Sequence, residues 1–69
     1  SSQWEYRYVN GVIQAKGVYY RGQRNGIWTW WHTSGVKSKQ GSYRRGKPTG
    51  VWVEWDERGK NLRRRVEGS

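Results

Sequence analysis

The chain has 69 residues, a formal net charge of +9 and a hydrophobic content of 32%. This length allows at most one small domain with a thin core. The chain has no cysteine, which excludes disulfides and thiolate chemistry, and no apolar run of the ~20 residues that a membrane-spanning helix needs. The absence of cysteine is compatible with the cytosol, which we favour as the location. Because 14 Lys and Arg face only 5 Asp and Glu, we expect an acidic partner.

Strands are predicted where aromatic and β-branched residues gather, in residues 4–8, 27–32 and 51–55. Each segment is followed by a turn that contains glycine, in residues 9–11, 33–35 and 57–59. Return strands are then expected over residues 12–21, 36–45 and 60 to about 66. Two glycine-bounded loops, residues 22–26 and 46–50, would lead into the next strands, with Pro48 inside the second loop. No helix is expected.

The chain repeats itself, because a shift of 24 residues overlays residues 17–40 on residues 41–64. The positions that agree are Gly17/Gly41, Tyr19/Tyr43, Arg21/Arg45, Gly22/Gly46, Gly26/Gly50, Trp28/Trp52, Trp31/Trp55 and Gly35/Gly59. A partial copy covers residues 4–16. Units of this length bury their apolar faces against their neighbours. The sequence therefore predicts one all-β domain over residues 1–69, a single-layer twisted antiparallel meander of about six strands.

The recurring rings predict how this thin sheet is held together. Six Trp and five Tyr are present while Phe and Met are absent, so burial must come from large flat rings. Equivalent residues two strands apart are separated by about 9.6 Å, a gap that one intervening ring can fill. We expect a ladder in which each ring covers a glycine of an adjacent strand, and Gly17 and Gly41 to mark a bulge or a close ring contact. The ladder residues would be Trp4, Tyr19, Trp28, Tyr43 and Trp52.

Two repeat positions change character from copy to copy and are therefore expected to face solvent or a ligand. They are occupied by Tyr6, Trp30 and Glu54, and by Tyr8, His32 and Asp56.

The grid of glycines and rings is similar to a known repeat. The segments Gly26-Ile27-Trp28-x-x-Trp31-x-x-x-Gly35 and Gly41-x-Tyr43-x-x-Gly46-Lys47-x-x-Gly50-x-Trp52 resemble the MORN-variant repeat of the YwqK antitoxin family. The resemblance covers residues 4–60. It implies an open, repetitive hairpin sheet that serves as a binding surface, with toxin neutralisation attributed to some relatives and no enzymatic activity. This chain is shorter and more basic than is usual in that family.

No catalytic, cofactor or metal site is predicted. His32 is the only histidine, and the serines have no paired base in a recognisable motif. Glu54, Asp56 and Glu57 form one acidic cluster, which could hold a divalent cation weakly across strands. We instead interpret this cluster as a partner of nearby Arg58 and Lys60.

The basic residues leave three hypotheses about the partner. We favour an acidic protein surface, with self-association through sheet edges or the aromatic face as an extension. The alternative is single-stranded nucleic acid, with Arg and Lys on phosphates and bases stacked on Trp30, Trp31 and Tyr20. Binding to an anionic membrane is the weakest hypothesis, because open sheet edges cannot enter hydrocarbon. The candidate partner-binding residues are Arg21, Arg24, Trp30, Trp31, Arg44, Arg45 and Lys47.

Overall fold

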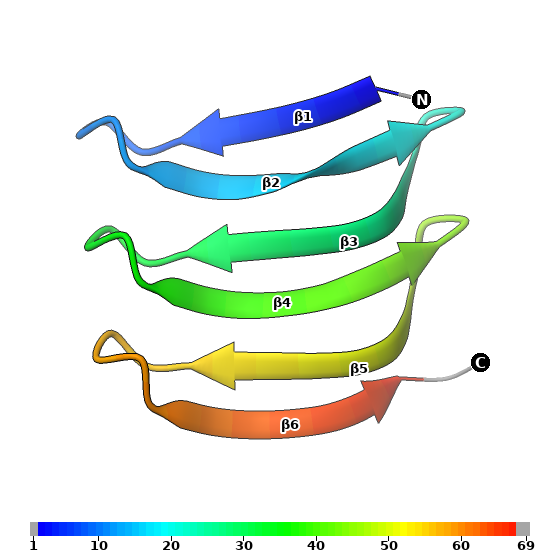
Figure 1. The fold of residues 1–69 in the computed structure, drawn as a ribbon. Coiled ribbons are helices and arrows are strands. Elements are labelled where there is room, and N and C mark those ends of the chain that lie inside the picture. Colours follow the sequence, from blue (N-terminus) through cyan, green and yellow to red (C-terminus); the bar gives the residue numbers. More distant parts are fainter. Residues whose placement is uncertain (1, 68–69) are drawn as a thin grey trace.

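Six antiparallel strands form one open sheet in which every strand lies beside its neighbours in sequence (Figure 1). The computed structural model describes residues 2–67, so Ser1, Gly68 and Ser69 of the expected domain lie outside the described residues. The strands are β1 (Ser2–Arg7), β2 (Ile13–Tyr20), β3 (Gln23–Trp31), β4 (Lys37–Arg44), β5 (Lys47–Trp55) and β6 (Asn61–Glu67). The all-β, single-layer meander expected from the sequence is confirmed.

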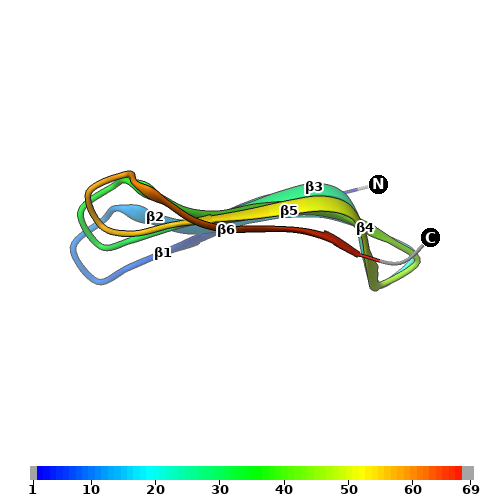
Figure 2. The ribbon, with the colours of Figure 1, turned by 90° about the horizontal axis from the view of Figure 1, so that it is seen from below.

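The sheet has no second layer over the described residues. It measures 32 × 26 × 10 Å, and Figure 2 shows it edge-on as one curved layer. The buried apolar side chains of residues 3–67 are Ala15, Trp28 and Trp52. No helix in this part of the chain is long and apolar enough to cross a membrane. The core is therefore a row of rings on one face of the sheet.

Glycine closes the three hairpins at one end of the sheet, as expected. In the first, the Gly11 amide donates to the Tyr8 carbonyl oxygen (2.9 Å) and the Tyr8 amide donates to the Val12 carbonyl oxygen (2.8 Å). The other two repeat this pattern. The third residue of each turn has a positive φ, 86° at Gly11, which glycine adopts without a steric penalty.

The turns at the opposite end are shorter than the predicted loops. Residues 22–26 and 46–50 were expected to be loops, and this prediction is wrong. Arg21 and Gly22 alone connect β2 to β3, with φ of 52° and 79°, and the next connection has the same form. Two left-handed residues in succession make a type I′ turn, whose twist matches that of the flanking strands. Pro48 therefore lies in β5, before the pairing of β5 with β6 begins at Gly50.

Glycine also bends the strands that follow these turns. Gly26 and Gly50 have φ of 76° and 75° inside β3 and β5. The register of β3 against β2 shifts at this point, between Lys16 and Val18. In Figure 2 the tips of these hairpins turn away from the plane of the sheet. These bends position Trp28 over Gly17 of β2 and Trp52 over Gly41 of β4.

Candidate functional site

The five residues of the expected ladder lie along one face of the sheet in two groups of edge-on contacts. The ring centroids of Trp4 and Tyr19 are 5.7 Å apart, and those of Tyr19 and Trp28 are 5.2 Å apart. Tyr43 and Trp52 are also separated by 5.2 Å. The Trp28 side chain is fully buried, whereas half of Trp4 is exposed.

Two residues from the candidate binding set join these groups. Trp30 lies 6.1 Å from Trp28 and 5.7 Å from Trp52 between ring centroids. The Arg24 guanidinium lies over Trp28 at 5.0 Å and over Tyr43 at 5.5 Å. Arg24 Nε is buried and has no hydrogen-bond partner among the described residues. Trp30 and Arg24 are thus integrated into the aromatic face.

Lys39 adds a second cation to this face. Its Nζ lies 4.5 Å from the centroid of the Trp30 ring and 5.8 Å from that of Trp52. A cation over an indole face is attracted by the ring quadrupole. Lys39 occupies the repeat position of Ala15, so the repeat pattern did not single it out. Its pairing opposite Trp30 across the strands is what brings them together.

Three polar groups meet near the first rings of the row. A side-chain hydrogen bond with Tyr19 raises the pKa of Tyr6. The same bond lowers the pKa of Tyr19, and a hydrogen bond to Arg24 lowers it further. The phenols and the guanidinium are therefore electrostatically coupled at this corner of the aromatic face.

Five cations lie where the two type I′ turns project. We call the cations of this region, Arg21, Arg24, Arg44, Arg45 and Lys47, the basic end. Arg44 and Lys47 are directly opposite each other in the β4–β5 pair, an arrangement of like charges that destabilises a hairpin. Within residues 2–67 the ion pairs join Arg7 to Glu5 and Arg65 to Glu54 and Glu67, so none of them neutralises the basic end.

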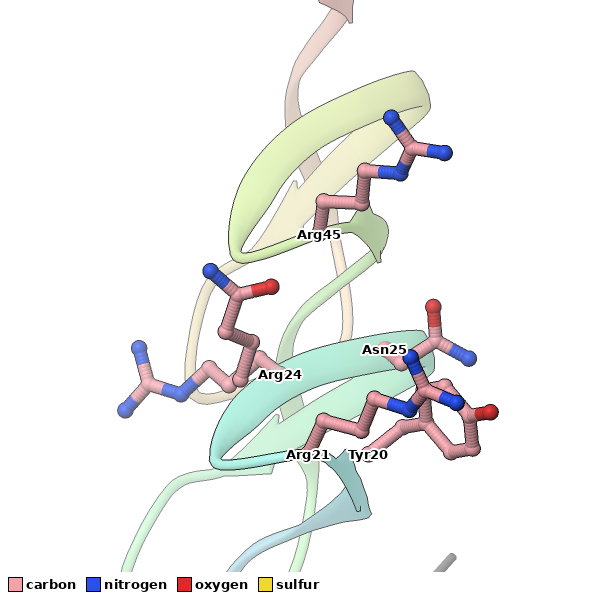
Figure 3. Close-up of a pocket in the computed structure, with 6 residues that line it drawn as sticks. Tyr20, Arg21, Arg24, Asn25 and Arg45 are labelled. Carbon is pink, nitrogen blue, oxygen red and sulfur yellow. The ribbon is translucent and has the colours of Figure 1, made fainter.

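The two turns of the basic end are held side by side. The Gly46 amide donates to the Arg24 carbonyl oxygen (3.1 Å), and Gly46 lies against the side chain of Gln23. A hollow of about 340 Å³ is lined here by Tyr20, Arg21, Gln23, Arg24, Asn25 and Arg45. Figure 3 shows the Arg21 and Arg45 guanidinium groups on one side of the bent strand and that of Arg24 on the other. Arg21 also lies over the Tyr20 ring at 5.2 Å.

The structure does not assemble the expected stacking platform of Trp30, Trp31 and Tyr20. Trp30 and Trp31 are successive residues of β3, so they point to opposite faces of the sheet. β3 starts at the basic end and finishes at Trp31, which places Trp31 at the far end of the sheet from Tyr20. Both tryptophans are half-buried.

Hydrogen bonds between successive repeats correct one prediction. Tyr8 and His32 were expected to face solvent or a ligand, but both reach the next repeat. Tyr8 Oη donates to the Trp31 carbonyl oxygen (2.7 Å), and His32 Nε2 lies 2.9 Å from the Trp55 carbonyl oxygen. Because a carbonyl only accepts, the His32 ring carries its proton on Nε2 in this contact. Sequence reasoning missed these bonds because it compared residue types, and Tyr and His differ in type. Both side chains nevertheless carry a hydrogen-bond donor at their tip.

The third residue at this position, Asp56, behaves differently because a carboxylate only accepts. Its Oδ1 accepts from the backbone amides of Arg58 (2.9 Å) and Lys60 (2.8 Å). Glu54 pairs instead with Arg65, at 3.9 Å. Within the acidic cluster, Asp56 thus contacts Arg58 and Lys60 through their backbone amides, and the ion pairs of residues 2–67 involve neither of their side chains. Residues 2–67 contain no group of three or more His, Cys, Asp or Glu side chains that could hold a metal ion.

Comparisons of this chain with protein-family models, with curated proteins and with solved structures found no match.

Proposed function

We propose that this chain is a non-enzymatic interaction module whose basic end binds an acidic surface of a partner protein. The observation that carries this proposal is that arginine occupies the first position of both type I′ turns. Arg21 and Arg45 hold φ of 52° and 54°, where asparagine and glycine are preferred. A residue other than glycine pays roughly 1–2 kcal/mol for this conformation. The contact of Arg21 with the Tyr20 ring offsets only part of this cost at the first turn, so binding explains the two arginines better than folding does.

The arrangement of charge supports the same role. Arg44 and Lys47 repel each other across the hairpin, and carboxylates from a partner would relieve this repulsion. The two turns are one repeat apart, which corresponds to about 9.6 Å between equivalent backbone positions. Arg21 and Arg45 flank the hollow from these two turns, so a partner that carries two carboxylates at that spacing could engage both. The resemblance to MORN-variant repeats fits a binding role of this kind.

The rings favour a protein over single-stranded nucleic acid as the partner. Stacking requires open ring faces beside the phosphate-binding cations. The ladder rings instead contact one another edge-on, and Trp28 is fully buried. At the basic end, the Arg21 guanidinium already covers the exposed Tyr20 ring. Little ring surface near these cations remains for a base.

A double substitution separates binding from folding. Arg21→Asn with Arg45→Asn removes both turn cations and installs a residue that suits the left-handed conformation. We expect calorimetric titration with a polyglutamate peptide to show affinity reduced by about tenfold or more, the equivalent of 1.4 kcal/mol or more. Urea unfolding should show a stability that is unchanged or higher.

The matched control is Arg58→Gln with Lys60→Gln, which removes two charges at the opposite end of the sheet. Its affinity for the peptide should stay near that of the parent chain. If both variants lost affinity for the peptide equally, the loss would follow from overall charge alone. That result would contradict the proposal. A single-stranded oligonucleotide of the same net charge that bound more tightly than the peptide would favour nucleic acid instead.

A further inference from the structure

The hollow at the basic end is lined by groups that donate hydrogen bonds. Its lining residues are Tyr20, Arg21, Gln23, Arg24, Asn25 and Arg45. Each of these side chains ends in an O–H or N–H group, and no carboxylate lines the hollow among the described residues. Its volume of about 340 Å³ is many times what one water molecule needs. The hollow is therefore suited to an anion that carries several oxygens.

Two of the lining arginines can share such an anion. The Arg24 guanidinium lies over the rings of Trp28 and Tyr43, and Figure 3 shows it on the other side of the bent strand from those of Arg21 and Arg45. The ion pairs of residues 2–67 involve neither Arg21 nor Arg45. Equivalent backbone positions of their two turns are about 9.6 Å apart. An ion that accepts a bond of about 2.8 Å from each guanidinium holds the guanidinium carbons roughly 8–10 Å apart, so one anion can bridge both turns.

A phosphate group matches this pair of arginines better than a carboxylate does. Arginine presents its N–H donors as a planar fork that bonds two oxygens at once. A carboxylate has two oxygens and one charge, so a single fork occupies it. A phosphorylated side chain has three acceptor oxygens and a charge of about −1.5 to −2 at pH 7, so it can bond two forks. The cations that line the hollow are all arginines, which favours this bidentate chemistry over a lysine point charge.

The two turns favour a protein over a lipid as the source of the phosphate. Side chains that hold a protein at a membrane surface are apolar or aromatic and enter the interface beside the cations. The two turns consist of Arg21-Gly22 and Arg45-Gly46, which provide no side chain of that kind. The ring that lines the hollow, Tyr20, is covered by the Arg21 guanidinium at 5.2 Å.

We propose that the hollow of the basic end binds a phosphorylated side chain of the partner protein, with one guanidinium from each type I′ turn on the phosphate. This inference rests on the proposed function, because it names the acidic group that the partner presents. Arginine clusters recognise phosphorylated motifs by the same chemistry. Phosphorylation of the partner then promotes binding, and removal of the phosphate reverses it.

Three peptides that differ at one site test the phosphate. The site holds phosphoserine in the first, two adjacent glutamates in the second, which equalises the net charge, and serine in the third. Calorimetric titration of the parent chain should show phosphoserine bound at least tenfold more tightly than the glutamate pair, and serine bound most weakly. From pH 5 to pH 7.5 the affinity for phosphoserine should rise by up to about tenfold, because the phosphate gains its second charge near pH 6. The affinity for the glutamate pair should change little over this range.

A charge-conserving variant tests the arginine forks. Arg21→Lys with Arg45→Lys keeps both charges and removes both forks, so it should lose most of the preference for phosphoserine over the glutamate pair. Arg58→Lys with Arg63→Lys is the matched control toward the opposite end of the sheet, and it should keep the preference. A lysine variant at the turns that keeps the full preference would overturn the proposal.

The remaining outcomes separate this proposal from the proposed function. Equal affinity for phosphoserine and the glutamate pair, with both weakened by Arg21→Asn and Arg45→Asn, would overturn the phosphate and leave the proposed function standing. If neither peptide bound, both proposals would fail. Vesicles of phosphatidylcholine with phosphatidic acid provide the lipid phosphate. If they bound more tightly than the phosphoserine peptide at equal accessible phosphate, the site would belong to a membrane surface and the proposal would be wrong.

Discussion

At the scale of single residues, the two buried tryptophans, Trp28 and Trp52, each lie on a glycine of the preceding strand. Trp28 lies on Gly17 with its ring fully buried, and its Nε1 donates to the Val18 carbonyl oxygen at 3.0 Å. Trp4 has the same repeat position, but its strand pairs on one side only among the strands that the structure describes. Trp4 and Trp28 thus share a repeat position and differ in burial.

Their alanine variants should therefore differ in stability. Trp28→Ala should cost ~3–5 kcal/mol, which is the usual loss for a buried tryptophan. A chain of 69 residues has a total stability of roughly 3–10 kcal/mol, so much of this variant should be unfolded. Trp4→Ala should cost less than ~2 kcal/mol, because half of the side chain is already exposed. Urea unfolding followed by circular dichroism measures both values, and equal losses would contradict this account of the core.

At the scale of the elements, the bend in β3 depends on backbone conformation alone. Gly26 has a φ of 76°, and a Cβ added there would meet no atom within 4 Å. The cost of a side chain at this position therefore comes from the left-handed backbone and not from crowding.

Substituting each enantiomer of alanine isolates that cost. Gly26→L-Ala should destabilise the chain by about 1–2 kcal/mol, the penalty for an L-residue in the left-handed region. Gly26→D-Ala, introduced by chemical synthesis, should keep or raise the stability, because a D-residue favours positive φ and restricts the unfolded chain. Thermal unfolding of the two synthetic proteins measures the difference. A loss of similar size in both would show that space, and not φ, limits this position.

At the scale of the whole molecule, stability should decrease from the middle of the sheet to its edges. Each strand contacts only its neighbours, as in other repeat proteins, and the sheet is a single layer 10 Å thick. The buried Trp28 and Trp52 lie in β3 and β5, while β1 and β6 each pair with a single strand within residues 2–67.

Hydrogen exchange should follow this order. The amides of β3 and β4 should exchange most slowly, because opening them breaks pairs on both sides. Those of β1 and β6 should exchange fastest among the strands. Exchange monitored by NMR gives the protection of each amide. Uniform protection across all six strands would indicate that the sheet opens as one unit and would contradict this gradient.

The sequence by itself determined the class and order of the elements, because strand formation depends on local patterns. Aromatic and β-branched segments such as residues 51–55 became strands, and Gly11 and its equivalents closed hairpins where their positive φ was needed. The repeat also predicted that ladder rings cover glycines of adjacent strands, and the structure places Trp28 on Gly17 and Trp52 on Gly41. These features follow from residue type and spacing.

Only the tertiary structure decided where the remaining side chains meet. The loops expected at residues 22–26 and 46–50 became two-residue turns and bends, because backbone twist across paired strands sets turn length. Arg24 and Trp30, which the sequence assigned to binding, became part of the aromatic face through cross-strand packing. The bonds of Tyr8 and His32 to the next repeat, and the neighbouring Arg21 and Arg45, depend on residues that are far apart in sequence. Register and strand bending, which no short segment specifies, bring these groups together.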